Sequence, residues 1–224
     1  MSVKEKLAQI NENIKEASLR SNRNKEDIRI IAVTKYVSIS KAKEAIEAGV
    51  VHLGENRDEG FLEKWDELRE NVTWHFIGTL QSRKVKNVID KLDYLHSLDR
   101  VSLAKELDKR ANKTIKCFVQ VNVAEEESKH GIHKDDVITF VKQLEQFKNI
   151  NVIGLMTMAP HTENEEIIRS CFRELKNLQQ KVQALKLEYA PCNELSMGMS
   201  NDYIIAIEEG ATFIRIGSAL VGNE

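Results

Sequence analysis

Short apolar runs rich in β-branched residues recur along the chain, with helical patterns between them. Eight runs have the length of buried strands: residues 28–34, 50–54, 73–78, 94–98, 115–123, 151–158, 193–197 and 212–217. Between them apolar residues recur at helical spacing, as in Val3, Leu7, Ile10 and Ile14. This alternation of strand and helix predicts a parallel sheet with helical crossovers.

Helix ends are also marked along the chain. Ser2 and Glu5 have the spacing of a capping box, and Thr162 and Glu165 repeat it before the long helix predicted from 168 to 185. Gly49 and Gly210 stand where helix C-caps are expected.

Eight strand–helix units in 224 residues predict a closed (β/α)8 barrel, with residues 1–224 as a single domain. An open doubly wound sheet is the alternative. That fold normally has a glycine-rich dinucleotide-binding turn after its first strand, and the segment VTKYVS has none. We therefore favour the barrel.

Composition narrows the classes of partner. Lys and Arg total 33 against 35 for Asp and Glu, so the net charge of −2 predicts no nucleic-acid partner. No apolar run reaches the roughly 18 residues of a membrane span. Cys117, Cys171 and Cys192 form neither a metal-spaced cluster nor an even disulfide set. We expect a cytoplasmic protein without a metal site.

Lys35 is a candidate nucleophile, because barrel active sites lie at the C-terminal ends of the strands. It ends the otherwise apolar run IIAVTK, where burial favours the neutral amine that forms Schiff bases. The alternative is a lysine that extends into solvent from the barrel rim.

The loops after the last two strands are candidates for an anion site. SMGMSND predicts a helix start at Ser200 or Asn201, and Gly217 and Ser218 precede a predicted short terminal helix. Backbone N–H groups at helix N-termini bind phosphate, and barrels often use these two loops for it. Alternatively, Ser200 only caps a helix and Gly217 only permits a tight turn.

Arg215 lies within the last predicted strand, on one face with Phe213 and Gly217. A buried guanidinium keeps its proton and needs a partner such as a phosphate, a carboxylate or a ring nitrogen. The structural alternative is an ion pair with Glu55 across the barrel. His75, in WHFIG, has the character of a packed or hydrogen-bonded core histidine.

Seven motifs, in this order, resemble the pyridoxal phosphate homeostasis proteins, single-domain binders of pyridoxal 5′-phosphate (PLP) similar to the barrel domain of alanine racemase. They are AVTKYVS around Lys35, LGENR around Asn56, WHFIGTLQSRK from Trp74, VNVAEEESKHGI from Val121, GLMTM from Gly154, ELSMGMSNDY from Glu194 and IRIGSALVG from Ile214. The resemblance covers nearly the whole chain and implies PLP fold type III, the alanine-racemase-like barrel.

The resemblance implies a role for each matching residue. Lys35 would form a Schiff base with PLP, and Arg215 would face the pyridine nitrogen. Ser200, Gly217 and Ser218 would form the phosphate site, with Asn201 nearby. The residues implied to line the pocket are Asn56, His75, Met156 and Ser196. Lys129 matches a family lysine linked to a secondary PLP contact. Position 218 is Ser where many relatives have Thr, and either hydroxyl can donate to phosphate.

The resemblance also implies a role in PLP homeostasis without catalytic residues. We expect a monomer that buffers PLP or delivers it to PLP-dependent apo-enzymes. An arginine has donors only, so it favours an unprotonated ring nitrogen and a weaker electron sink. Few residues follow the last predicted strand, so we expect no second domain to enclose a substrate. The alternatives are an amino-acid racemase of low activity and a Schiff-base aldolase acting on a phosphorylated substrate.

Overall fold

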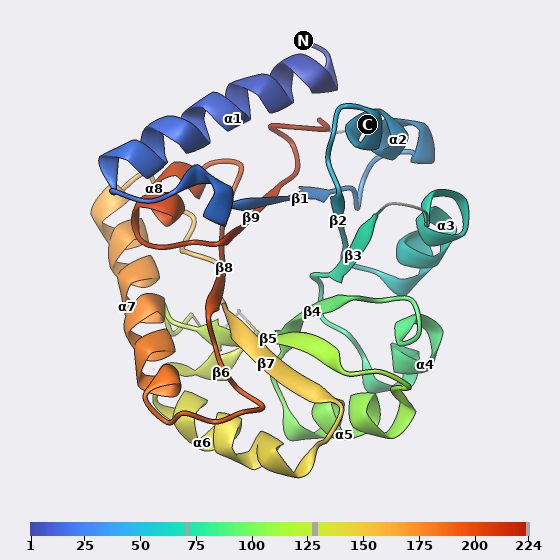
Figure 1. The fold of residues 1–224 in the computed structure, drawn as a ribbon, viewed down its shortest axis with the longest axis vertical. Coiled ribbons are helices and arrows are strands. Elements are labelled where there is room, and N and C mark those ends of the chain that lie inside the picture. Colours follow the sequence, from blue (N-terminus) through green and yellow to red (C-terminus); the bar gives the residue numbers. More distant parts are fainter. Residues whose placement is uncertain (70–71, 127–129, 223–224) are drawn as a thin grey trace.

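Eight parallel strands close into a barrel, which confirms the predicted architecture (Figure 1). The computed structural model describes residues 1–69, 72–126 and 130–222. The barrel strands are β1 (Arg29–Val33), β2 (His52–Glu55), β3 (Thr73–Phe76), β4 (Tyr94–Leu98), β5 (Ile115–Asn122), β7 (Ile150–Met156), β8 (Glu194–Met199) and β9 (Phe213–Ile216). Because β1 pairs with β9 and β4 with β5, the ring closes and the open-sheet alternative is wrong.

A ninth strand, β6 (Ile132–His133), pairs in parallel with the end of β5 and lies outside the ring. Two residues carry no hydrophobic periodicity, so the sequence pattern did not predict this strand.

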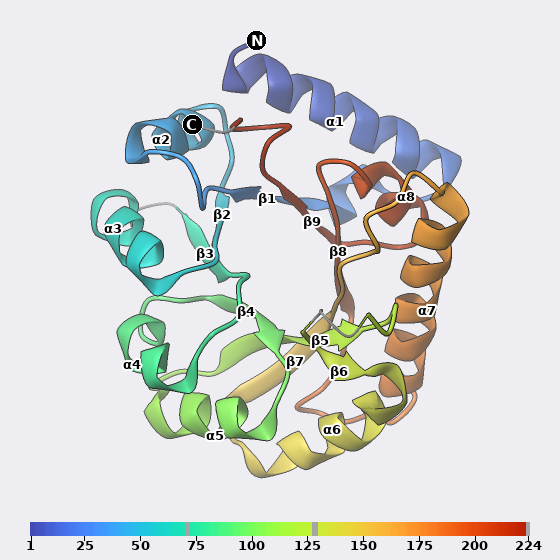
Figure 2. The ribbon, with the colours of Figure 1, turned by 180° about the vertical axis from the view of Figure 1, so that it is seen from behind.

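Helices surround the ring in both views (Figure 2). They are α1 (Val3–Arg20), α2 (Ile39–Glu47), α3 (Asp58–Leu68), α4 (Val85–Val88), α5 (Val101–Arg110), α6 (Val137–Gln143), α7 (Glu165–Gln183) and α8 (Tyr203–Glu208). Short 3-10 helices occupy Lys25–Asp27, Ser82–Lys84, Lys134–Asp136 and Leu144–Gln146. In the three described ranges, no helix combines the length and the apolarity needed to cross a bilayer.

The predicted helix ends are confirmed in part. Ser2 and Glu5 form a reciprocal capping box at the start of α1, and Gly49 and Gly210 adopt φ of +109° and +111°. The second predicted capping box is wrong. Asn164 caps α7 by accepting from two backbone N–H groups, while the Thr162 hydroxyl accepts from Asn164.

Strand alternation sorts side chains between the interior of the ring and the layer under the helices. In β3, Trp74 and Phe76 point outward and pack on Phe61 of α3. His75 lies between them in the sequence and points inward, with its ring 5.8 Å from that of Phe213 of β9. The ring interior therefore combines apolar and histidine side chains, which bears on the site above it.

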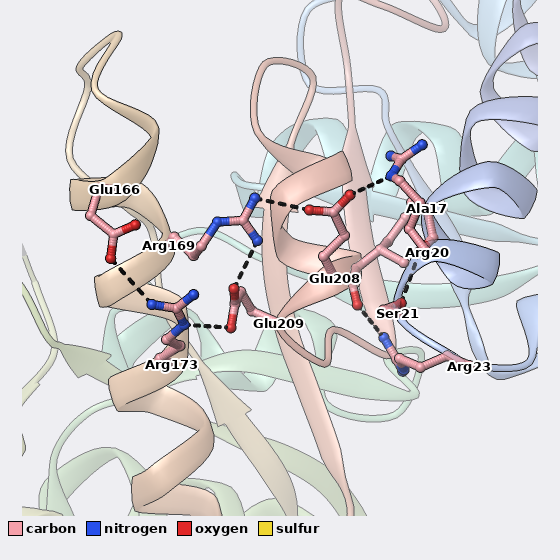
Figure 3. Close-up of polar contacts among 10 residues, drawn as sticks. Ala17, Arg20, Ser21, Arg23, Glu166, Arg169, Arg173, Glu208 and Glu209 are labelled. Atoms are coloured by element: carbon pink, nitrogen blue, oxygen red, sulfur yellow. Dashed lines mark hydrogen bonds and ion pairs between the residues drawn. The ribbon is translucent and has the colours of Figure 1, made fainter.

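Arginines from two helices hold α8 in place (Figure 3). Arg169 of α7 contacts Glu209 at 2.8 Å and Glu208 at 2.9 Å, and Arg20 of α1 contacts Glu208 at 2.8 Å. Arg173 adds a contact of 3.1 Å to Glu209. Because α8 follows the loop after β8, this cluster anchors one wall of the candidate site.

Candidate functional site

A cavity of about 1160 Å³ opens at the C-terminal ends of the barrel strands. Its volume is slightly above the roughly 300–1,000 Å³ of typical small-molecule sites. Seven of the predicted site residues line it: Lys35, Asn56, Ser200, Asn201, Arg215, Gly217 and Ser218. The barrel thus brings together Arg215 of β9 and residues from the loops after β1, β2, β8 and β9.

The remaining predicted site residues lie elsewhere. His75, Met156 and Ser196 do not line the cavity but are buried in the ring interior beneath it. They point into the ring from β3, β7 and β8, so they form the layer that supports the cavity. Lys129 lies outside the described residues, although His130, which follows it, lines the cavity.

Lys35 is exposed, so the expectation that it is buried is wrong. β1 ends at Val33, and Thr34 takes the buried position after it and donates to the Glu55 carboxylate at 2.6 Å. Lys35 therefore starts the turn at the barrel rim, with its Nζ 4.6 Å from the centroid of the Tyr36 ring. The alternative of a lysine extending from the rim describes its position, and its side chain still lines the cavity.

Asn56 lies half-buried on the same rim, where glycine permits close packing. A Cβ built on Gly78 would lie 2.3 Å from the Asn56 carbonyl oxygen, so only glycine fits there. Gly78 lines the cavity with Asn56, which places the ends of β2 and β3 in contact at this wall.

The Ser200 hydroxyl joins the two loops that were predicted to bind an anion. Its Oγ accepts from the backbone N–H groups of Gly217 and Ala219, each at 3.3 Å. A hydroxyl accepts two hydrogen bonds and donates one, so its proton is what Ser200 can offer to a ligand. The helix predicted to start at Ser200 or Asn201 instead starts at Tyr203, so the alternative that Ser200 caps it is also wrong.

The second loop forms a single helical turn rather than the predicted terminal helix. The N–H of Val221 donates to the Gly217 carbonyl at 2.9 Å, and that of Gly222 donates to Ser218 at 3.2 Å. Ser218 is exposed at the cavity edge. The two loops therefore offer hydroxyl groups and backbone N–H groups on one side of the cavity.

Packing within the protein does not require a glycine at position 217. A Cβ built on it would meet Val33 at 3.6 Å, an ordinary van der Waals contact. Because both residues line the cavity, that Cβ would occupy space beside the loop N–H groups. The missing side chain keeps the backbone open to a ligand.

Arg215 is the buried cation of the site, with 4% of its surface exposed. Its Nη1 donates to Ser196 Oγ at 2.7 Å and its Nη2 to the Thr157 carbonyl at 2.9 Å. Burial lowers the pKa of Arg215 to about 10, and the nearby Asp202 opposes that change, so the guanidinium stays charged at neutral pH.

The alternative ion pair between Arg215 and Glu55 is wrong. Glu55 points out of the ring toward α3, where it pairs with Lys64 at 3.0 Å. Arg215 points inward, so strand alternation puts the two side chains in different layers.

Three buried or half-buried histidines below the cavity were not predicted as a group. His52, His75 and His96 stand at inward positions of the neighbouring strands β2, β3 and β4. The pKa values of His75 and His96 are well below the usual value, first because of burial and then because of nearby charged or histidine groups. Both rings are therefore neutral.

Comparisons with known proteins agree with this geometry. Residues 6–224 match the family model described as alanine racemase, N-terminal domain. The pyridoxal phosphate homeostasis protein of Aquifex aeolicus is 38% identical over all of this chain and 99% of its own length. That of Escherichia coli K12 is 33% identical over 96% of this chain and 94% of its own.

The chain belongs to the pyridoxal phosphate homeostasis protein family. A solved family structure, PipY of Synechococcus elongatus PCC7942 with PLP bound, superposes with a TM-score of 0.84 at 32% identity, covering 98% of this chain and all of that one. An alanine racemase of Clostridium difficile 630 has a TM-score of 0.71 at 17% identity. It shares the fold alone, and the match covers 54% of its chain.

Proposed function

We propose that this protein binds PLP in the cavity at the C-terminal ends of the strands and takes part in PLP homeostasis. The observation that carries the proposal is the meeting of an amine, a cradle of hydroxyl and N–H donors, and a buried guanidinium in one cavity. The family's PLP-bound PipY structure supports the same ligand.

The donor set fits each part of PLP. Ser200, Ser218 and the backbone around Gly217 would hold the phosphate, with Asn201 at the rim. Lys35 would hold the aldehyde end through its amine as a Schiff base, and Arg215 would face the ring. Asn56 would line the pocket, while His75, Met156 and Ser196 would support it from below. Lys129 is proposed to make a secondary PLP contact.

The cofactor supplies a reactive aldehyde and a ring that withdraws electrons from a bound amine. Two features of this chain favour storage over turnover. Arg215 brings only donors to the ring, which weakens electron withdrawal, and it is already engaged by Ser196 and Thr157. Lys35 is exposed, so water and acceptor amines can reach the attachment point. A site open to water exchanges its ligand and controls reactions poorly.

We therefore propose a cytoplasmic monomer, with residues 1–224 as one domain, that buffers PLP or passes it to PLP-dependent apo-enzymes. Mixing the purified protein with PLP should produce a visible absorption band. Borohydride reduction followed by mass spectrometry should map the PLP adduct to Lys35. Lys35→Ala should abolish both signals, while Lys43→Ala, at an exposed lysine of α2, should change neither.

Three outcomes would contradict parts of the proposal. A wild-type protein that gives no band with PLP does not bind it in this way. Racemisation of alanine well above the rate with free PLP would support a racemase instead. Borohydride trapping of a sugar phosphate in place of PLP would support an aldolase.

A further inference from the structure

A continuous chain of hydrogen bonds crosses the ring interior from the cavity to the opposite mouth. Arg215 Nη1 lies 2.7 Å from Ser196 Oγ, which lies 2.8 Å from His96 Nδ1. His96 Nε2 lies 2.9 Å from His75 Nδ1, and His75 Nε2 lies 3.0 Å from His52 Nδ1. His52 opens β2, so the chain ends at the N-terminal mouth of the barrel.

The hydrogens along this chain can point in only two ways. A neutral imidazole donates at one nitrogen and accepts at the other, so the three rings must all share one direction. In the first arrangement Ser196 donates to His96, and every ring hydrogen points toward His52. In the second His52 Nδ1 donates to His75, and every ring hydrogen points toward Ser196.

Burial restricts protonation to one end of the chain. His75 and His96 have no exposed surface, and burial above all holds their pKa values well below normal. His52 is half-buried, and its pKa is lowered less far, by burial and by Arg29, while Asp93 opposes that change. A proton from solvent therefore binds at His52.

Several charged or titratable groups surround His52 at this mouth. Arg29 of β1 pairs with Glu194 of β8 at 3.2 Å, and Asp93 precedes β4. Tyr94 stacks on His75 at 4.5 Å between centroids, and Lys116 of β5 lies over Tyr94. Protonation of His52 is thus opposed by Arg29 and favoured by Asp93, with Lys116 acting on the neighbouring ring of His75.

We propose that His52, His75 and His96 form a polarity switch that couples protonation at the N-terminal mouth to Ser196 and Arg215 in the cavity. Protonated His52 carries a hydrogen on both nitrogens, so it must donate to His75, and only the second arrangement remains. One proton is gained, at His52. His75, His96 and Ser196 each keep one proton, and in the two rings it moves to the other nitrogen.

The switch changes the hydrogen bond that Ser196 offers to Arg215. In the first arrangement Ser196 accepts from Arg215 while it donates to His96, and the two hydrogen bonds strengthen each other. In the second arrangement Ser196 accepts from both His96 and Arg215, so this mutual strengthening is lost. This weakens the support that Ser196 gives to the guanidinium. Coupling between two sites is reciprocal. A ligand held against Arg215 must therefore shift the titration of His52, and this step rests on the proposed binding of PLP.

The first experiment needs no ligand. Histidine ring ¹⁵N spectra of the whole protein, recorded from pH 5 to pH 8, report which nitrogen carries the hydrogen. We expect His75 and His96 to change tautomer at the midpoint of His52, with exposed His133, which lies outside the chain of hydrogen bonds, as the internal control. His52→Asn, which takes up no proton, should abolish the change at His96. A tautomer of His96 that stays constant through the His52 titration would overturn the proposal.

The second experiment adds PLP and separates the two proposals. Bound PLP should move the His52 midpoint by about 0.7 pH unit, the shift that a fivefold coupling gives. Ser196→Ala, which cuts the chain beside Arg215, should remove that shift while His75 still follows His52. If PLP does not bind, the proposed function fails and the ligand-free switch stands or falls on the first experiment. If PLP binds and the midpoint stays fixed, the coupling to the cavity is wrong.

Discussion

Ser200 Oγ lies 3.3 Å from the backbone nitrogen of Gly217, and this contact joins the loop after β8 to the loop after β9. The same oxygen accepts from Ala219, so a single hydroxyl orders the N–H groups of the second loop. The proposed phosphate site therefore depends on the Ser200 side chain to hold the backbone N–H groups of the neighbouring loop in place.

We expect Ser200→Ala and Ser218→Ala each to weaken PLP binding by about 1 kcal/mol, or roughly fivefold in Kd, which is the value of one hydrogen bond. Ser200→Ala should also lower the melting temperature, because Gly217 and Ala219 lose their acceptor. Ser218 is exposed, so Ser218→Ala should leave the melting temperature unchanged. Fluorescence titration and thermal denaturation measure both effects, with exposed Ser102→Ala as the control. Unchanged affinity in both cradle variants would contradict the phosphate assignment.

Gly217→Ala should separate binding from folding. Its Cβ meets Val33 at 3.6 Å, so the fold tolerates it, whereas PLP binding should fall because the methyl group occupies the cavity. Gly154→Ala is the contrasting variant, because its Cβ would lie 2.1 Å from the Glu194 carbonyl oxygen. That clash should cost about 2–3 kcal/mol of unfolding free energy. Urea denaturation and PLP titration distinguish the two, and equal destabilisation would show that Gly217 is structural.

Arg215→Ala should change the pH dependence of the PLP absorption band, because it removes the charge proposed to face the ring. It should also raise the pKa of His96, which burial lowers first and the charge of Arg215 lowers further. Spectra recorded across the pH range and histidine NMR test the two statements. Exposed Arg110→Ala, on α5, is the control. An unaltered PLP titration in Arg215→Ala would assign this arginine a purely structural role.

The cluster around α8 predicts how stability depends on pH. Although burial opposes the change, hydrogen bonds from Arg20 and Arg169 lower the pKa of Glu208. A lowered folded-state pKa stabilises above the unfolded value of about 4.3, and this stabilisation is lost as pH falls through the folded pKa. Glu208→Gln should therefore cost about 1 kcal/mol at pH 7 and nothing at pH 2. Denaturation curves at both pH values test this. The control is Glu12→Gln, which removes an exposed ion pair with Lys15 on α1 and should leave the free energy of unfolding unchanged at both pH values.

The sequence pattern predicted the eight barrel strands because each is a buried apolar run. It also placed the loops after the last two strands at the cavity, because the C-terminal ends of barrel strands meet there. It failed where side chains compete for one position. Asn164 stands directly before α7 and took the capping role from Thr162, and Thr34 took the buried position expected for Lys35.

Strand alternation, applied to β9 alone, put Arg215 inside the ring. Applied also to β2, it would have put Glu55 outside and excluded their pairing. The histidine chain needed the register between strands. His52, His75 and His96 are separated by 23 and 21 residues, and only the parallel pairing of β2, β3 and β4 brings them into contact.

The pairing of β1 with β9 has a consequence for synthesis on the ribosome. β1 emerges before β9 and can complete its hydrogen bonds only when β9 is available. Arg20 of α1 likewise can pair with Glu208 only after α8 has emerged. Until β9 has been translated, the nascent protein carries an unpaired strand edge of the kind that promotes aggregation. Slow translation of the segment between β1 and β9 would prolong that exposed state, and chaperones that cover strand edges would reduce aggregation during it.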